Sequence, residues 1–170
     1  GKLGLGHTND VLVPTRVAAI GGAVRSVCAG RYHAACITGD GRVWSWGSGY
    51  GGKLGHGDHE TRSLPTAVAS TAFAAKQITA GANCTLVIDT DDAIWIAGRL
   101  RYGGSSSATF TRIQFPDTPG LPPLRFSQVV CTHEHALAVT TDGGLFSWGW
   151  GRGGQLGHGS TEDIDVPRLV

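Results

Sequence analysis

The sequence lacks the features of several protein classes. Only 16% of its 170 residues are charged and the net charge is +1, so the chain has no general electrostatic attraction to nucleic acid or to anionic membranes. It has no methionine, and no apolar run approaches the ~20 residues of a membrane-spanning helix. No charged-then-apolar signal peptide opens it. These absences favour an intracellular protein, cytoplasmic or nuclear, with no strong nucleic-acid signal and no membrane partner.

Cysteine pairs of the C-x-x-C type are also missing. Four cysteines lie in apolar stretches, at Cys28, Cys36, Cys84 and Cys131. This arrangement favours buried thiols in a reducing compartment over a disulfide framework or a metal site. We therefore expect no metal and no cofactor.

What the sequence does have is a fixed period. Four prolines, Pro14, Pro65, Pro116 and Pro167, are each separated by 51 residues. A constant period over a whole chain indicates one supersecondary unit built several times. The predicted organisation is the tail of one repeat at 1–20 and repeats at 24–75, 76–126 and 127–170. The chain starts partway through a unit, so we expect it to be an excerpt from a longer protein.

The first complete repeat predicts four short strands. The first three runs are Val24–Ala29, His33–Thr38 and Arg42–Trp46. The Asp-Gly turn before the third run is typical of a hairpin. A glycine-rich loop over 47–64 leads to a fourth run at 66–69, with Pro65 at its start as in an outer strand. Because one small sheet cannot bury both faces, the repeats should stack radially as four-stranded antiparallel blades of an all-β propeller.

Residues expected to support this packing recur in register. At the 51-residue period the repeats superpose without gaps, and Trp44, Trp95 and Phe146 align, which predicts aromatic contacts between blades. His33 and His135 should be buried donors to loop carbonyls rather than metal ligands, whereas the histidines of the glycine turns should be exposed. The expected structural set is Gly30, His33, Trp44, Trp46, Gly47, Trp95, His135, Phe146, Trp148 and Gly149.

These motifs resemble a known repeat. Repeat one reads Trp44-Ser45-Trp46-Gly47 and then Leu54-Gly55-His56-Gly57, and repeat three reads Phe146-Ser147-Trp148-Gly149 and then Leu156-Gly157-His158-Gly159. The pattern strongly resembles the regulator of chromosome condensation (RCC1-like) repeat family over the whole chain. The resemblance implies a seven-bladed propeller, of which this chain would hold about three blades.

Repeat two departs from that pattern. Ala97 stands where the other repeats have tryptophan, and Ser105-Ser106-Ser107 replaces Leu-Gly-x-Gly. The loop 99–110 should therefore follow a different path. It is either degenerate or a surface specialised for a partner.

Motifs that suggest enzyme chemistry have a simpler explanation. Gly47-x-Gly49-x-x-Gly52 fits the dinucleotide fingerprint, but it opens no helix of a βαβ unit and recurs in repeat three. The spacing supports no catalytic triad or dyad. We expect no covalent catalysis.

Exposed arginine and aromatic residues in the loops remain for function. Strand order places the first turn and the long loop of each repeat on one side of the disc, where Tyr, Trp and Arg suit protein recognition. The candidate contact residues are Arg31, Tyr32, Tyr50, Arg62, Arg99, Arg101, Tyr102, Trp150 and Arg152. The favoured hypothesis is a non-catalytic protein-interaction propeller, part of a larger protein. The family resemblance implies an alternative, guanine-nucleotide exchange on a Ran-type small GTPase.

Overall fold

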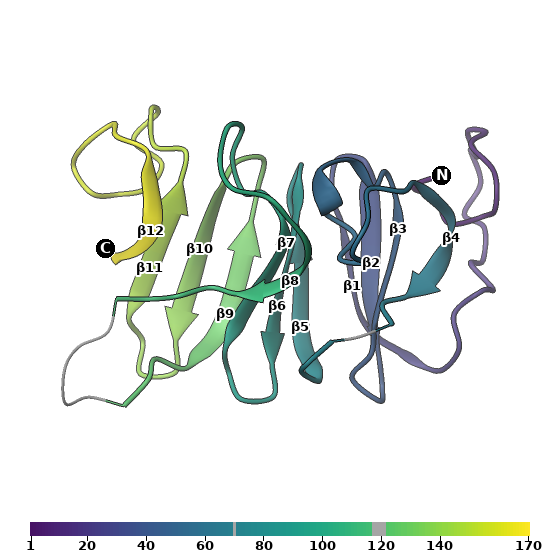
Figure 1. The fold of residues 1–170 in the computed structure, drawn as a ribbon, viewed down its shortest axis with the longest axis horizontal. Helices are drawn as coiled ribbons and strands as arrows, with labels where there is room; N and C mark the ends of the chain where they lie inside the picture. Colours follow the sequence, from purple (N-terminus) through teal and green to yellow (C-terminus); the bar gives the residue numbers. More distant parts are fainter. Residues whose placement is uncertain (70, 117–121) are drawn as a thin grey trace.

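The computed structural model describes residues 1–69, 71–116 and 122–170, which form three four-stranded antiparallel sheets (Figure 1). The first contains β1 (Val24–Ala29), β2 (His33–Thr38), β3 (Val43–Gly47) and β4 (Arg62–Ala67). The second contains β5 (Ala75–Ala80), β6 (Cys84–Asp89), β7 (Ile94–Gly98) and β8 (Ser107–Arg112). The third contains β9 (Phe126–Cys131), β10 (His135–Thr140), β11 (Leu145–Gly149) and β12 (Ile164–Leu169). A short 3-10 helix, η1 (Tyr50–Gly52), lies in the β3–β4 loop.

The three sheets stand side by side as blades. Within each sheet the strands follow chain order, and the first strands of neighbouring sheets, β1 with β5 and β5 with β9, contact each other. Each sheet therefore has its first strand on the inside and its fourth on the outside. The predicted all-β propeller architecture is confirmed. We call the junction between sheets one and two the first junction, and that between sheets two and three the second junction.

The inner turns of neighbouring blades touch through their backbones. The Arg31 N–H donates to the Gly81 carbonyl at 3.3 Å. A Cβ atom at Gly30 would lie 2.3 Å from that carbonyl oxygen, and one at Gly81 would lie 2.4 Å from the Thr132 oxygen. Glycine is required at both positions because any side chain would push the next blade away.

The fourth strand differs from the prediction. The sequence predicted residues 66–69 with proline at the start, whereas β4 spans Arg62–Ala67 and encloses a buried Pro65. Pro167 is likewise buried inside β12. An outer strand pairs on one side only, so a proline can lie within it without removing a ladder hydrogen bond.

The gap-free superposition of repeat two is wrong beyond β7. The pairs that begin the contact between third and fourth strands are Gly47–Arg62, Gly149–Ile164 and Gly98–Ser107. The partner lies fifteen positions after the glycine in repeats one and three but nine positions after it in repeat two. The β7–β8 loop is therefore six residues shorter. The connection 113–125 that follows it is six residues longer than its counterpart 68–74, which restores the period.

Because of this compensation, Pro116 is not structurally equivalent to the other repeat prolines. Pro116 is exposed and lies beyond β8, in the long connection. The position equivalent to Pro65 is occupied by Phe110, the fourth residue of β8. The 51-residue spacing of Pro116 therefore does not reflect structural equivalence.

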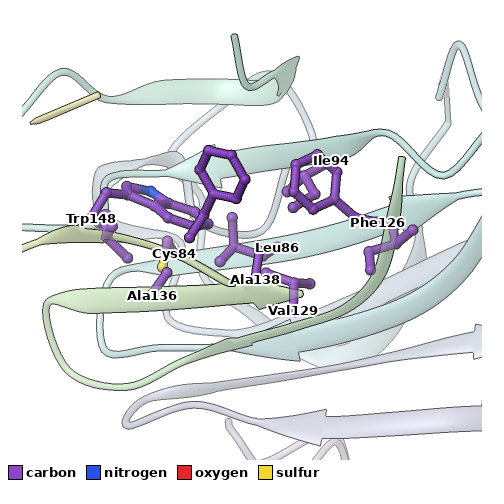
Figure 2. Packing of buried hydrophobic residues seen from close by; sticks show 11 residues of the cluster. Cys84, Leu86, Ile94, Phe126, Val129, Ala136, Ala138 and Trp148 are labelled. Atoms are coloured by element: carbon purple, nitrogen blue, oxygen red, sulfur yellow. The ribbon is translucent and has the colours of Figure 1, made fainter. Parts of the chain in front are cut away.

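Each junction has its own hydrophobic core. At the first junction, Ile37 and Val43 pack with Ile78 and Val87 of the second sheet. At the second, side chains of β6 and β7 meet those of β9, β10 and β11, as Figure 2 shows for Leu86, Phe126 and Trp148 among others. Burial of these apolar faces supplies most of the free energy that holds neighbouring blades together.

The aligned aromatic residues of the third strands all lie on the face of their sheet that contacts the segment before the first strand. Trp95 stacks on Phe73 with ring centres 4.6 Å apart. Phe146 meets Phe115 edge to face at 5.5 Å, and the Trp44 ring lies beside Gly21. In all three repeats this aromatic residue packs against the segment that leads into the blade.

Candidate functional site

One end of the three sheets carries the first turns and the long loops. Because the strands are antiparallel, the β1–β2, β5–β6 and β9–β10 turns share this end with the β3–β4, β7–β8 and β11–β12 loops, along the upper edge of Figure 1. We call this surface the loop face. The Asp-Gly hairpin turns lie at the opposite end.

The structure places the nine candidate contact residues in two groups. Six are exposed on the loop face: Arg31, Tyr32, Tyr50, Tyr102, Trp150 and Arg152. The other three, Arg62, Arg99 and Arg101, are half-buried. The half-buried arginines differ in whether their guanidinium groups are already paired.

Two of these arginines pair with carboxylates. Arg62 donates to both oxygens of Asp58 at 2.9 and 2.8 Å, and the hydrogen bond from Arg62 holds the pKa of Asp58 well below its usual range. Arg101 donates to Asp165 at 2.7 and 2.9 Å and so joins the repeat-two loop to the third sheet. These pairs hold the loops in place.

Arg99 is different, because it stacks between two tyrosines. Its guanidinium carbon lies 5.6 Å from the centre of the Tyr50 ring and 4.9 Å from that of Tyr102. Its Nε is buried and has no hydrogen-bond acceptor within the described part of the chain. Both tyrosines are exposed, at 63% and 74%. We call these three residues, which span the first junction, the Arg99 cluster.

A buried lysine supports the cluster from below. Lys53 is 1% exposed, and its ammonium group donates to the Tyr50 carbonyl at 2.9 Å. Burial lowers the pKa of Lys53, and the nearby charge of Arg99 lowers it further. The lysine therefore fixes the loop that presents Tyr50.

His33 connects the same loop to the second sheet. Its Nε2 lies 2.9 Å from the Thr85 hydroxyl, which donates to the Lys53 carbonyl at 2.7 Å. Because the Thr85 hydroxyl proton is donated to the Lys53 carbonyl, the hydroxyl oxygen accepts a hydrogen bond from the His33 Nε2–H. The expected loop carbonyl is reached through this threonine rather than directly, and nothing in the repeat pattern indicated Thr85. Burial, followed by the charge of Lys53, lowers the pKa of His33 to about 4.

His135, the counterpart in repeat three, has a local partner instead. It is half-buried, and its Nδ1 lies 2.8 Å from the Thr132 hydroxyl. Among the described residues sheet three is followed by no further sheet, so a contact like that of His33 with the next sheet has no counterpart to compare at His135.

The histidines of the glycine turns are not exposed as predicted. His56 and His158 are half-buried. Ser45 donates to the Leu54 carbonyl at 2.7 Å and lies 3.0 Å from His56 Nε2, and Ser147, Leu156 and His158 repeat the arrangement. The glycine turns fold each imidazole back onto a buried serine, and burial lowers the pKa of His56.

The remaining structural residues lie where backbone space is limited. Gly47 and Gly149 have φ of 101° and 109°, and each lies against the turn between the first and second strands of its own blade. Trp46 is 7% exposed and donates from its indole to the Lys2 carbonyl at 3.0 Å. Trp148 is 4% exposed.

A cavity of about 370 Å³ opens beside the Arg99 cluster at the second junction. Repeat two lines it with Ile96, Leu100 and Ser105, among others, and repeat three with Trp148, Ile164 and Asp165. The sequence predicted an altered loop here but not a cavity, because the cavity arises from the shortening of the β7–β8 loop relative to the β3–β4 loop.

Other chemistry is not supported. Among the described residues no group of three or more His, Cys, Asp or Glu side chains is placed to hold a metal ion. The four cysteines are unpaired thiols, and burial raises the pKa of Cys28 to about 12 and that of Cys36 to about 11. A raised pKa makes the Cys28 and Cys36 thiols poor nucleophiles. No helix in the described ranges is long and apolar enough to cross a membrane.

Comparison with family models agrees with this architecture. The regulator of chromosome condensation (RCC1) repeat matches residues 1–37, 40–88 and 142–170, and a second model of the repeat matches 24–52 and 126–155. The chain belongs to the RCC1 repeat family. Neither set of matched residues includes 89–125, the region with the shortened loop and the lengthened connection.

Known relatives cover the whole chain but are longer than it. The chain is 32% identical over 173 residues to the ultraviolet-B receptor UVR8 of Arabidopsis thaliana, matching 100% of this chain and 39% of the receptor. It is 30% identical over 183 residues to human E3 ubiquitin-protein ligase HERC2, matching 100% of this chain and 4% of the ligase. The chain thus spans less than half of either relative.

Solved structures show the same fold. Human WBSCR16 superposes with a TM-score of 0.87 at 25% identity, over 99% of this chain and 45% of that one. Prp20 of Saccharomyces cerevisiae superposes with a TM-score of 0.70 at 22% identity, over 86% of this chain and 38% of that one. The three sheets are therefore blades of an RCC1-type propeller.

Proposed function

We propose that this chain is a non-catalytic part of an RCC1-type propeller that binds a protein partner through its loop face, centred on the Arg99 cluster. The observation that carries the proposal is the stack of Arg99 between Tyr50 and Tyr102. Arginine and tyrosine are enriched among residues that dominate protein interfaces. A guanidinium held by two rings loses little side-chain entropy on binding.

The chemistry of the cluster indicates the kind of group that it would contact. The buried Arg99 Nε has no acceptor within the described residues, and the buried Lys53 adds a second positive charge nearby. A carboxylate or a carbonyl of the partner would pair with the guanidinium, while apolar groups would cover the tyrosine rings. The arrangement needs no bound metal or cofactor.

Site-specific photo-crosslinking of the full-length protein tests this proposal. A benzophenone amino acid replaces Tyr102 on the loop face or, as the control, the exposed Arg42 at the opposite end. We expect a discrete protein adduct from position 102 and none from position 42. Once the partner is identified, Arg99→Lys should weaken its binding about tenfold, since lysine keeps the charge but loses the planar stack. Equal crosslinking from both ends would contradict the proposal.

A second candidate function is guanine-nucleotide exchange on a Ran-type small GTPase. It is favoured by one observation, the superposition on Prp20, whose structure was described together with its binding to Gsp1p and histones. The full-length protein would accelerate nucleotide release by contacting the GTPase, without covalent chemistry. A release assay with labelled nucleotide on a Ran-type GTPase tests this function, and a rate equal to spontaneous release would exclude it. An intracellular location, cytoplasmic or nuclear, is part of both proposals.

A further inference from the structure

The long loops of two repeats, the one that precedes sheet one and repeat one itself, end on the outer strand of the next blade and cover it. Comparison with these two covered places shows which contacts are absent at the cavity of the second junction.

The first of these places lies on sheet one. The N-terminal segment Lys2–Gly6, the tail of the preceding repeat, runs along β3 and β4. The Trp46 indole donates to the Lys2 carbonyl at 3.0 Å, and the Gly6 N–H donates to the Ser63 carbonyl at 2.9 Å. A Cβ atom at Gly4 would lie 2.8 Å from the Trp46 indole nitrogen, so only glycine fits over the ring.

The second place is the first junction. The Leu54-Gly55 segment of repeat one lies against β8, where the Gly57 N–H donates to the Ala108 carbonyl at 2.8 Å and His56 forms a β-bridge with Thr109. Leu54 is 1% exposed. A Cβ atom at Gly55 would lie 2.4 Å from the Phe110 ring, which again restricts the position to glycine.

Sheet three offers the same groups without the covering segment. Trp148 is the equivalent of Trp46, and Asp165, the second residue of β12, is the equivalent of Ser63 and Ala108. Within residues 1–69, 71–116 and 122–170, neither the Trp148 indole N–H nor the Asp165 carbonyl has a partner like those at the other two places. Both residues line the 370 Å³ cavity.

Repeat two cannot supply the segment itself. Its β7–β8 loop is six residues shorter than the loop of repeat one, and its closest residues to the cavity are Gly103, Gly104 and Ser105. Where Ser45 holds the Leu54 carbonyl in repeat one, repeat two has Ile96, which also lines the cavity. The walls are therefore more apolar than at the first junction, and no buried hydroxyl needs a carbonyl partner.

We infer that this cavity, which we call the Trp148 groove, binds an extended segment of the partner protein that contains a leucine followed by glycine. The leucine fills the space over Ile96, the glycine lies flat on the Trp148 ring, and backbone groups of the segment pair with the indole N–H and the Asp165 carbonyl. This is β-strand addition at the outer edge of the third blade. The inference rests on the proposed function, because it names the segment by which a partner of the loop face is held.

Fluorescence anisotropy on the full-length protein tests the inference. The probe is a fluorescein-labelled peptide with the sequence of residues 52–58, Gly-Lys-Leu-Gly-His-Gly-Asp. We expect saturable binding. Two control peptides, with serine in place of the leucine or valine in place of the glycine that follows it, should not bind.

Three protein variants locate the site. Trp148→Phe keeps the ring packing but removes the N–H, and should weaken peptide binding about fivefold. The matched control Trp46→Phe alters a tryptophan already covered by residues 2–6 and should leave binding unchanged. Ser105→Leu fills the groove from its rim, at an exposed loop position, and should abolish binding.

Several outcomes would overturn the inference. They are the absence of saturable binding, equal affinity of the serine control peptide, or unchanged affinity in both Trp148→Phe and Ser105→Leu. Self-association of the protein that the peptide reverses would assign the groove to a second copy of the chain instead. If Tyr102 still crosslinks to a partner while the peptide does not bind, only this inference fails. If Tyr102 fails to crosslink, the proposed function fails.

Discussion

The two junctions between the blades are built at the same 51-residue spacing but are closed differently. The first is covered on the outside by the Leu54-Gly55 segment and joined through the buried His33–Thr85 hydrogen bond. Within the described residues the second has neither feature, and Cys84 stands in the place of His33. Phe115, from the segment before β9, fills this junction, with its ring centre 4.3 Å from that of Phe126. Equal spacing therefore fixes the positions of the first three strands of each blade, while the fourth strand and the segments between blades can shift. The difference yields four predictions, given from the largest expected effect to the smallest.

The second junction should depend most on its aromatic residues. Phe126 is 1% exposed and contacts Phe115 and Phe146. Phe126→Ala should lower the free energy of unfolding by about 3–5 kcal/mol, because the cavity left in a packed aromatic group cannot collapse. Denaturant unfolding of the full-length protein measures it. The matched change at the first junction, Phe73→Ala, removes a half-buried ring and should cost less. A larger loss for Phe73→Ala would reverse our ranking of the two junctions.

The first junction should weaken in acid. The pKa of His33 is about 4 in the folded protein and about 6.5 when unfolded. Above pH 6.5 both states are neutral at this residue. Between pH 6.5 and 4 the unfolded chain takes up the proton first, so stability falls as the pH falls, by up to about 3 kcal/mol.

Denaturation midpoints at pH 7 and pH 4.5 check this expectation. His33→Gln should remove most of the acid-dependent loss. His56, whose pKa is also lowered by burial, contributes the same background to the parent protein and to this variant. An unaltered pH dependence in His33→Gln would show that the imidazole does not set the acid sensitivity.

The serines under the glycine turns should make a smaller contribution. Ser45 and Ser147 are fully buried, and each donates to a leucine carbonyl at 2.7 Å. Replacing either by alanine leaves that carbonyl without a donor and should cost about 1–2 kcal/mol of unfolding free energy. Ile96→Ser in repeat two should bring no gain, since no loop carbonyl is placed over it by the residues that the structure describes. Stabilisation by Ile96→Ser in denaturant unfolding would contradict the proposed absence of a covering segment.

The ion pair at the rim of the Trp148 groove should matter least. Arg101 and Asp165 lie 2.7 Å apart, but the Asp165 side chain is 70% exposed. Arg101→Ala should change the unfolding free energy by about 0.2–1 kcal/mol at low salt. The effect should shrink further in 1 M salt, where the screening length is about 3 Å. A loss that persists in 1 M salt would indicate that the arginine packs as well as pairs.

The sequence predicted the regular parts of the fold well, for a physical reason. The first two strands of repeat one have the predicted bounds, because turn residues end each apolar run. The fourth strand was placed too late, since proline was taken as its start although an outer strand can contain one. Periodicity also aligned Pro116 with Pro65, because a six-residue deletion followed by a six-residue insertion leaves the period intact.

The candidate site was predictable only in part. The unusual composition of the repeat-two loop drew attention to Arg99 and Tyr102, and the structure brings both to Tyr50 of the neighbouring repeat. That Arg62 and Arg101 are paired with carboxylates could not be read from the sequence, because the partners depend on loop geometry. The histidines of the glycine turns were assigned to solvent, although the turns themselves direct them onto buried serines.

The contact between Gly30 and Gly81 has a consequence for how such a disc can change over time. Where two turns meet through main-chain atoms alone, no substitution compatible with the fold can alter their separation, so the hub keeps its radius. Variation in length is tolerated at the outer edge, where the loop before the fourth strand can lose residues and the connection after that strand can gain them. New binding specificity in this architecture is thus expected to arise at the outer strands, where a shortened loop leaves uncovered a surface that the loop of other repeats covers.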